Sequence, residues 1–169
     1  MRRRIIQLLS LAFLTTLAAC HSSDIKGFKK TDDGLYYRFE NMDQNAQPVC
    51  YGDQVVGELT MRLDDEVLLT NEGQPVPLFV VRDSVFNGYD FSRGLLMMHK
   101  GDRATFAIFA DTVAHYFRYN QLPAKYLPGT HMVFYYDVHI VDIITADSLQ
   151  RARIAQITAA DSAKNTSDK

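Results

Sequence analysis

Residues 131–140, His-Met-Val-Phe-Tyr-Tyr-Asp-Val-His-Ile, alternate between apolar and mixed side chains. One face of an extended chain would carry Met132, Phe134, Tyr136, Val138 and Ile140. A period of two residues is that of a strand in a sheet that is covered on one side. This stretch therefore predicts a long strand with one face in a hydrophobic core.

Shorter segments repeat the pattern and surround this strand. Further strands are expected at Arg103–Ala110, Val55–Leu63, Val67–Leu69 and Leu78–Val81, with a turn at Asp64-Asp65. One internal helix is expected over Ser92–Met98, ended by Lys100-Gly101. Its Leu95, Leu96 and Met98 would face the core. Several antiparallel strands packed on one short helix predict an α+β fold.

The N-terminus has the pattern of an export signal. Three arginines at positions 2–4 precede the uncharged run Ile5–Leu17, which is short for a membrane span. The run ends in Leu17-Ala18-Ala19-Cys20. Small residues followed directly by cysteine resemble the lipobox of bacterial lipoproteins, which implies cleavage after residue 19, acylation of Cys20 and a lipid-anchored protein of the cell envelope, on the periplasmic face or the cell surface. An ordinary secretory signal with a cysteine at its cleavage site is the alternative.

Loss of residues 1–19 would change the charge of the chain. The three signal arginines leave without any acid, so 15 Lys and Arg remain against 20 Asp and Glu, a net charge of about −5. That balance disfavours nucleic acid or an anionic membrane surface as a partner. With Cys20 acylated, Cys50 is the one remaining thiol, so no internal disulfide can form. Cys50 is expected to be half-buried, with a reactive or intermolecular role as the alternative.

The remaining chain suits a single domain. Residues 20–33 are polar and predict a tether, and residues 34–144 hold the domain. Residues 145–169 predict a short helix, capped by Asp147 or Ser148 and ending near Ala160, and then a polar tail.

Signals for metal or cofactor chemistry are missing from the sequence. The histidines lack zinc-ligand spacing, and no GxSxG motif or glycine-rich phosphate loop occurs. We therefore expect neither a metal nor another cofactor.

Five fragments occur in a fixed order along the middle of the chain. They are Gly34-Leu35-Tyr36-Tyr37, Gly52-Asp53-Gln54-Val55-Val56, Val85-Phe86-Asn87-Gly88-Tyr89, residues 94–104 (Gly-Leu-Leu-Met-Met-His-Lys-Gly-Asp-Arg-Ala), and Leu127-Pro128-Gly129 leading to Met132-Val133-Phe134. In order and spacing they resemble the FKBP-type peptidyl-prolyl cis-trans isomerases, over about residues 34–143. Phe109-Ala110-Asp111-Thr112 followed by the late Pro-Gly also resembles the divergent FKBP-like lipoproteins of Bacteroidetes.

This resemblance implies a twisted antiparallel sheet wrapped around one short helix, with an apolar pocket for a proline side chain between them. The implied pocket lining is Val85, Phe86, Tyr89, Leu127 and Phe134, with Tyr89 as the floor. Degenerate pocket positions, where active members carry tyrosine, Phe-Asp and tyrosine, fall on Leu59, Leu69-Thr70 and Ala114. Thr70 or the nearby Tyr116 could supply a substitute hydroxyl.

The implied function is that of a weak prolyl isomerase that assists the folding of exported proteins and binds proline-containing segments. The departures leave two alternatives open: a binding module without turnover for proline-containing or extended segments, and a structural lipoprotein whose pocket residues are only core. The sequence gives no oligomeric state.

Overall fold

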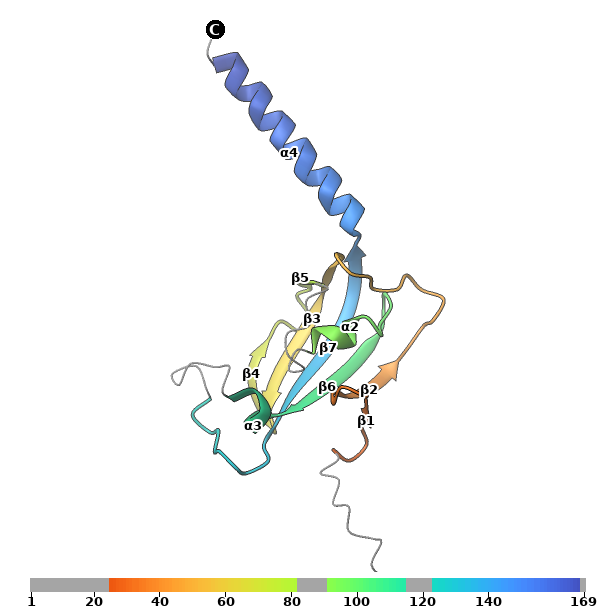
Figure 1. Cartoon of the computed structure of the whole chain (residues 1–169), viewed down its shortest axis with the longest axis vertical. Coiled ribbons are helices and arrows are strands. Elements are labelled where there is room, and N and C mark those ends of the chain that lie inside the picture. Colours follow the sequence, from red (N-terminus) through yellow and green to blue (C-terminus); the bar gives the residue numbers. More distant parts are fainter. Residues whose placement is uncertain (1–24, 82–90, 115–122, 168–169) are drawn as a thin grey trace, which may run out of the picture.

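The computed structural model describes residues 25–81, 91–114 and 123–167. For residues 161–167 it describes the backbone alone. Its centre is a seven-stranded antiparallel sheet in the order β1-β2-β6-β7-β3-β4, with β5 also paired to β3 (Figure 1). The strands are β1 (Lys29–Lys30), β2 (Tyr36–Asn41), β3 (Gln54–Leu63), β4 (Glu66–Thr70), β5 (Val76–Val80), β6 (Arg103–Phe109) and β7 (Val133–Ile144). The helices are α2 (Ser92–Leu95), α3 (Ala110–Val113) and α4 (Ala146–Ser167).

Strand β7 organises the sheet, because it pairs along its length with β3 on one side and β6 on the other. Phe134, Tyr136, Val138 and Ile140 of this strand are buried, as is Met132 just before it, which confirms the predicted strand and its core face. The predicted β3–β4 hairpin, β5 and β6 are confirmed as well. The fold is α+β, as the sequence predicts.

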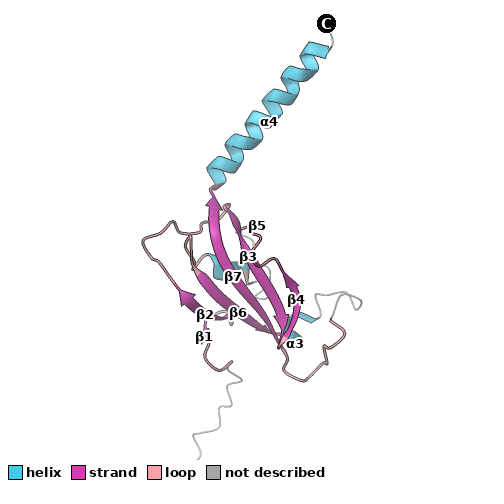
Figure 2. Cartoon of the chain, turned by 180° about the vertical axis from the view of Figure 1, so that it is seen from behind, coloured by secondary structure: helices cyan, strands magenta, loops and turns pink. Residues whose placement is uncertain are grey.

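Helix α2 covers one face of the sheet, which we call the inner face; Figure 1 views the molecule from this side and Figure 2 from the opposite, outer face. Leu95 and Met98 are fully buried against the sheet together with Phe106 and Phe134. The helix is shorter than the predicted Ser92–Met98, because tighter turns replace it: the Met98 amide donates to the Leu95 carbonyl at 3.0 Å. Met98 nevertheless reaches the core.

Residues 25–33 belong to the folded domain, which corrects the expectation that a tether runs to residue 33. Strand β1 pairs with β2, and Ile25 is buried on the outer face of the sheet. The Phe28 ring packs on Tyr135 at 5.8 Å between centroids. The alternation of apolar and polar residues does not reveal this segment, because strand β1 has only two residues.

The C-terminal helix α4 projects from the end of β7 away from the sheet (Figure 1). Its first turn is capped by Thr145, whose Oγ1 accepts from the Ser148 amide at 3.3 Å, and not by Asp147 or Ser148 as expected. The helix also continues past Ala160 to Ser167, since no glycine or proline in that stretch interrupts it. None of the described helices is long and apolar enough to cross a membrane.

Cys50 is exposed, not half-buried, because it lies in the turn before β3. Its amide donates to Asp53 Oδ2 at 3.0 Å, so this turn is held by its backbone and leaves the thiol in solvent.

Candidate functional site

Four aromatic rings of the described residues gather on the inner face, where the chain enters α2. Phe91 stacks on Tyr136 with ring centroids 4.3 Å apart and planes 19° apart. Phe79 meets the Phe91 ring edge-on at 5.4 Å, and Phe106 lies at 6.1 Å from it. We call Phe79, Phe91, Phe106 and Tyr136 the aromatic cluster.

Each ring reaches the cluster from a different element. Tyr136 on β7 lies opposite Phe106 on β6, so both side chains point to the inner face. Phe79 comes from β5 and Phe91 from the residue that precedes α2. Phe91 and Tyr136 are only 7% and 8% exposed, and Phe79 is half-buried. The cluster is therefore a largely buried group of apolar rings, contributed by both the sheet and the helix start.

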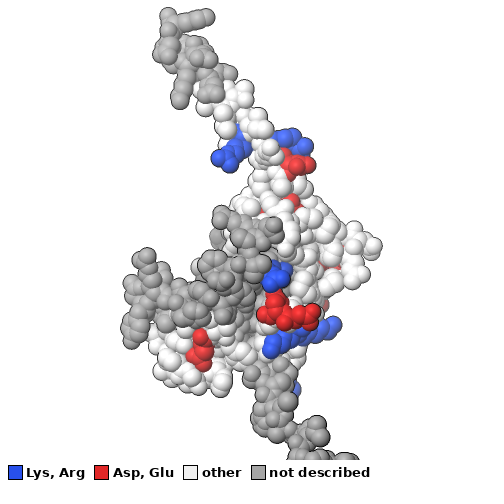
Figure 3. All heavy atoms as spheres, viewed as in Figure 1, with Lys and Arg blue, Asp and Glu red and all other residues white. Residues whose placement is uncertain are grey.

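Much of the surrounding described surface carries no charge. Figure 3 shows that the charged side chains on this face gather in a few places, among them the N-terminal segment and α4. Near that segment Arg93 of α2 forms an ion pair with Asp33.

Several residues of the predicted pocket lie outside the described residues. These are Val85, Phe86, Tyr89 and Tyr116, as well as the predicted lipidation site Cys20. Of the described ones, Phe134 and Leu59 are buried on the inner face. Leu59 lies opposite Val138 on β7, two register positions from the Met61–Tyr136 pair.

Strand β4 places Leu69 and Thr70 differently from each other. Leu69 lies opposite Met61 at the inner face and is 56% exposed at the sheet edge. The Thr70 hydroxyl lies 2.8 Å from that of Thr60. Because Thr60 lines a hollow on the outer face, Thr70 points away from the aromatic cluster.

A β-bulge causes this orientation. Met61 pairs with Leu69 and Arg62 pairs with Val67, so Leu68 is an extra residue on β4. If the bulge were absent and Leu68 paired with Met61, Thr70 would lie opposite Leu59 on the inner face. The hydroxyl that could replace a missing contact is therefore turned to the other side of the sheet.

Two further predicted positions lie near α3. Leu127 is 60% exposed in a turn that precedes β7. Ala114 follows α3 as its C-terminal cap residue and offers only a methyl group. Among the described residues neither adds a hydrogen-bonding side chain to the aromatic cluster.

Phe91 is the residue that sequence reasoning missed. The resemblance over Val85–Tyr89 places the pocket floor on Tyr89, which lies outside the described residues, and assigns no role to Phe91. Phe91 and Leu95 are spaced i, i+4, which sets two apolar side chains on one helix face and is the signal that points to Phe91.

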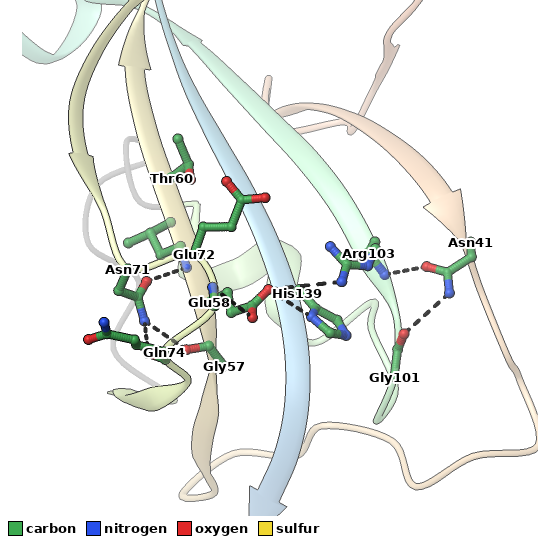
Figure 4. Close-up of polar contacts among 12 residues, drawn as sticks. Asn41, Gly57, Glu58, Thr60, Asn71, Glu72, Gln74, Gly101, Arg103 and His139 are labelled. Carbon is green, nitrogen blue, oxygen red and sulfur yellow. Dashed lines mark hydrogen bonds and ion pairs between the residues drawn. The ribbon is translucent and has the colours of Figure 1, made fainter.

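Part of the outer face carries a polar network (Figure 4). Glu58 accepts from the Gly73 amide at 3.1 Å and lies 3.1 Å from His139 Nδ1, with Arg103 at 3.9 Å. The hydrogen bond from His139 is the main reason why the pKa of Glu58 is lowered. These residues border an open hollow of about 220 Å³.

Asn71 links the same network to the sheet edge (Figure 4). Its Oδ1 accepts from the Leu59 amide at 2.6 Å, and its Nδ2 donates to the Gly57 and Gln74 carbonyls at 3.0 Å each. The side chain replaces strand pairing in the gap between β4 and β5.

Within the described part of the chain, no group of three or more His, Cys, Asp and Glu side chains is arranged to hold a metal ion. The outer-face network thus braces the sheet.

Comparison with known proteins supports the fold. No protein-family model matches the sequence, and no curated protein matches it. Among solved structures, FkpA from Escherichia coli aligns with a TM-score of 0.52 at 20% identity, over 73% of this chain and 55% of that one. A peptidyl-prolyl cis-trans isomerase from Pseudomonas syringae pv. tomato aligns with a TM-score of 0.51 at 18% identity, over 73% and 85% of the two chains.

The FKBP domains of wheat FKBP73 align more distantly, with a TM-score of 0.46 at 18% identity, over 66% and 45% of the chains. The alignment with FkpA covers 55% of that protein, so this chain spans about half the length of FkpA. The architecture is FKBP-like, an antiparallel sheet packed on a short helix, with a C-terminal helix following it.

Proposed function

We propose that this chain is an exported, lipid-anchored protein whose FKBP-like domain binds proline-containing segments and isomerises their prolyl bonds slowly. The aromatic cluster carries the proposal: it puts shielded rings between the sheet and the start of α2 in a fold shared with solved prolyl isomerases. Assistance to the folding of other exported proteins is the role that fits such an activity in the cell envelope.

The reaction needs little from acids, bases or nucleophiles. Rotation about a prolyl bond faces a barrier of about 18–20 kcal/mol, because the planar amide is stabilised by resonance and the twisted one is not. A dry aromatic surface that fits the twisted, less dipolar amide better than the planar one lowers the barrier by differential binding. Stacked Phe91 and Tyr136 provide such a surface.

Slow turnover is the expected result of the polar groups that the described part of the inner face lacks. Leu59 is apolar, Ala114 carries a methyl group, and the Thr70 hydroxyl bonds to Thr60 on the outer face. Within the aromatic cluster only Tyr136 has a hydroxyl. Each missing hydrogen bond to the twisted amide removes about 1 kcal/mol or more of transition-state stabilisation, or at least several-fold in rate.

Exchange spectroscopy on an apolar-Xaa-Pro peptide tests the proposal. We expect cis-trans exchange faster than the uncatalysed rate, and a loss of most of that acceleration in Tyr136→Phe. Tyr135→Phe is the matched control, because Tyr135 is the neighbouring residue of β7 and packs on Phe28 at the outer face. Equal effects of the two substitutions would contradict a role for Tyr136.

A binding module without turnover is the second candidate, favoured by the outward orientation of Thr70. In that case the parent protein binds the peptide while exchange stays at the uncatalysed rate. If neither binding nor exchange is found, a structural lipoprotein remains as the third reading of the chain.

A further inference from the structure

The turn before β7 is held by one carboxylate of α3. Asp111 Oδ1 accepts from the Tyr126 hydroxyl at 2.7 Å, and its two carboxylate oxygens lie 3.0 and 3.2 Å from the Gly129 amide nitrogen. These hydrogen bonds join the two parts of the Asp111 and Pro128-Gly129 pattern noted in the sequence. We call Asp111, Tyr126 and Gly129 the clasp.

The clasp fixes the turn at both of its ends. The Tyr126 ring packs against the core cluster, and its amide donates to the Pro123 carbonyl at 2.9 Å. Gly129 adopts a φ of +76°, a conformation that favours glycine, and in it the amide faces Asp111. The Thr130 hydroxyl closes the turn by donating to the Leu127 carbonyl at 2.6 Å.

The rigid turn presents an apolar side chain to solvent. Leu127 lies between the two clasped residues and is 60% exposed, the highest value among the exposed large apolar residues of the described chain. An exposed leucine on a braced turn gains nothing for the core, whereas a ligand meets it without the cost of ordering the turn. This geometry is that of a preorganised contact.

We propose that Asp111 is a positioning residue that holds Leu127 in place for contact with a bound prolyl peptide. The inference rests on the proposed function, and it assigns the carboxylate a role exerted through Leu127, without contact between Asp111 and the peptide. The hydrogen bonds from Tyr126 and Gly129 also lower the pKa of Asp111, so the clasp stays charged at neutral pH.

A double-mutant cycle on the whole protein tests the coupling, with the affinity for an apolar-Xaa-Pro peptide as the readout. Leu127→Ala should weaken binding about five- to tenfold by loss of an apolar contact. Asp111→Ala should weaken it about three- to tenfold, the cost of ordering one side chain on binding. In the Leu127→Ala background, Asp111→Ala should have no further effect, because the group it positions is gone.

Two more variants separate positioning from stability. Tyr126→Phe removes one hydrogen bond and keeps the ring in the core, so it should give a smaller loss of affinity than Asp111→Ala. Asp142→Ala is the matched control, since Asp142 also forms a hydrogen-bonded ion pair, 2.6 Å from Lys100, at the far end of β7. It should leave peptide affinity unchanged.

The outcomes are distinct. A parent protein that binds no prolyl peptide refutes the proposed function and this inference with it. A parent that binds while Asp111→Ala has no effect, or while Asp111→Ala and Leu127→Ala act additively, overturns the inference alone. Non-additive losses confined to the clasp and Leu127 support it.

Discussion

Gly94→Ala should destabilise the protein, although helix propensity alone predicts that it stabilises it. In a helix, alanine is ordinarily more stable than glycine by about 1 kcal/mol. An alanine Cβ at position 94 of α2 would lie 2.1 Å from Phe106 Cε1 and 2.5 Å from Cδ1. The Phe106 ring is fully buried beside Phe91, so it cannot turn aside without disturbing the aromatic cluster.

The two effects can be weighed against each other. Carbon atoms in good contact are about 3.5–4.0 Å apart, so the ring and the helix must separate by more than 1 Å. Overpacking of a core costs about 1–3 kcal/mol, and a contact this close belongs at the upper end. After the helical gain of about 1 kcal/mol, Gly94→Ala should lower the free energy of unfolding by about 2 kcal/mol. For a chain of this size the melting temperature would fall by roughly 4–8 °C.

Thermal and urea unfolding followed by circular dichroism measure this change. Phe106→Leu supplies the rescue, because it removes the ring that an alanine at position 94 would meet. The Gly94→Ala/Phe106→Leu protein should melt no lower than Phe106→Leu alone. A Gly94→Ala protein that melts at or above the parent temperature would refute the packing of α2 on Phe106.

Three other predictions address the anchor, the sheet edge and the clasp. Cys20→Ser should leave the precursor uncleaved or release the protein from membranes, and unchanged detergent partitioning would contradict lipidation at that cysteine. Asn71→Ala should cost about 1–3 kcal/mol in urea unfolding, because three backbone groups lose their partner, whereas exposed Glu72→Ala should cost little. The pKa of Asp111 is lowered from 3.8, chiefly by the hydrogen bond from the Tyr126 hydroxyl. The stabilisation that Asp111 provides is therefore complete above pH 3.8 and is lost as pH falls through the lower pKa of the folded protein. Titration of the Gly129 amide resonance by NMR should show a midpoint below 3.8.

Local signals explain what the sequence could predict of the fold. Alternation identified β3, β6 and β7, and Asp64-Asp65 identified the turn between β3 and β4. Asp64 has a φ of 49°, and its Oδ1 accepts from the Val133 amide at 2.9 Å, so this turn also tethers the start of β7. These features depend on neighbours in the chain or on side-chain period, which a single sequence displays.

Features that depend on distant partners could not be predicted. Burial of Ile25 requires the outer face of β6 and β7, and the two-residue strand β1 has no period to detect. The orientation of Thr70 depends on the bulge at Leu68, and a bulge cannot be detected in the alternation of so short a strand. The candidate site is therefore less predictable than the sheet that carries it.

Residues 94–104, one of the fragments that carry the family resemblance, contain a structural element that supports the fold. Asp102, the last residue of its Met-x-x-Gly-Asp part, is fully buried and accepts from the amides of Asp43 and His99 at 2.8 Å each. Its own carbonyl accepts from the Ile140 amide at 3.0 Å, which ties the turn after α2 to β7. A match in this fragment therefore indicates the fold and is silent on catalysis. Under the proposed function, turnover depends on side chains that face the aromatic cluster, and the bulge in β4 turns the Thr70 hydroxyl away from it.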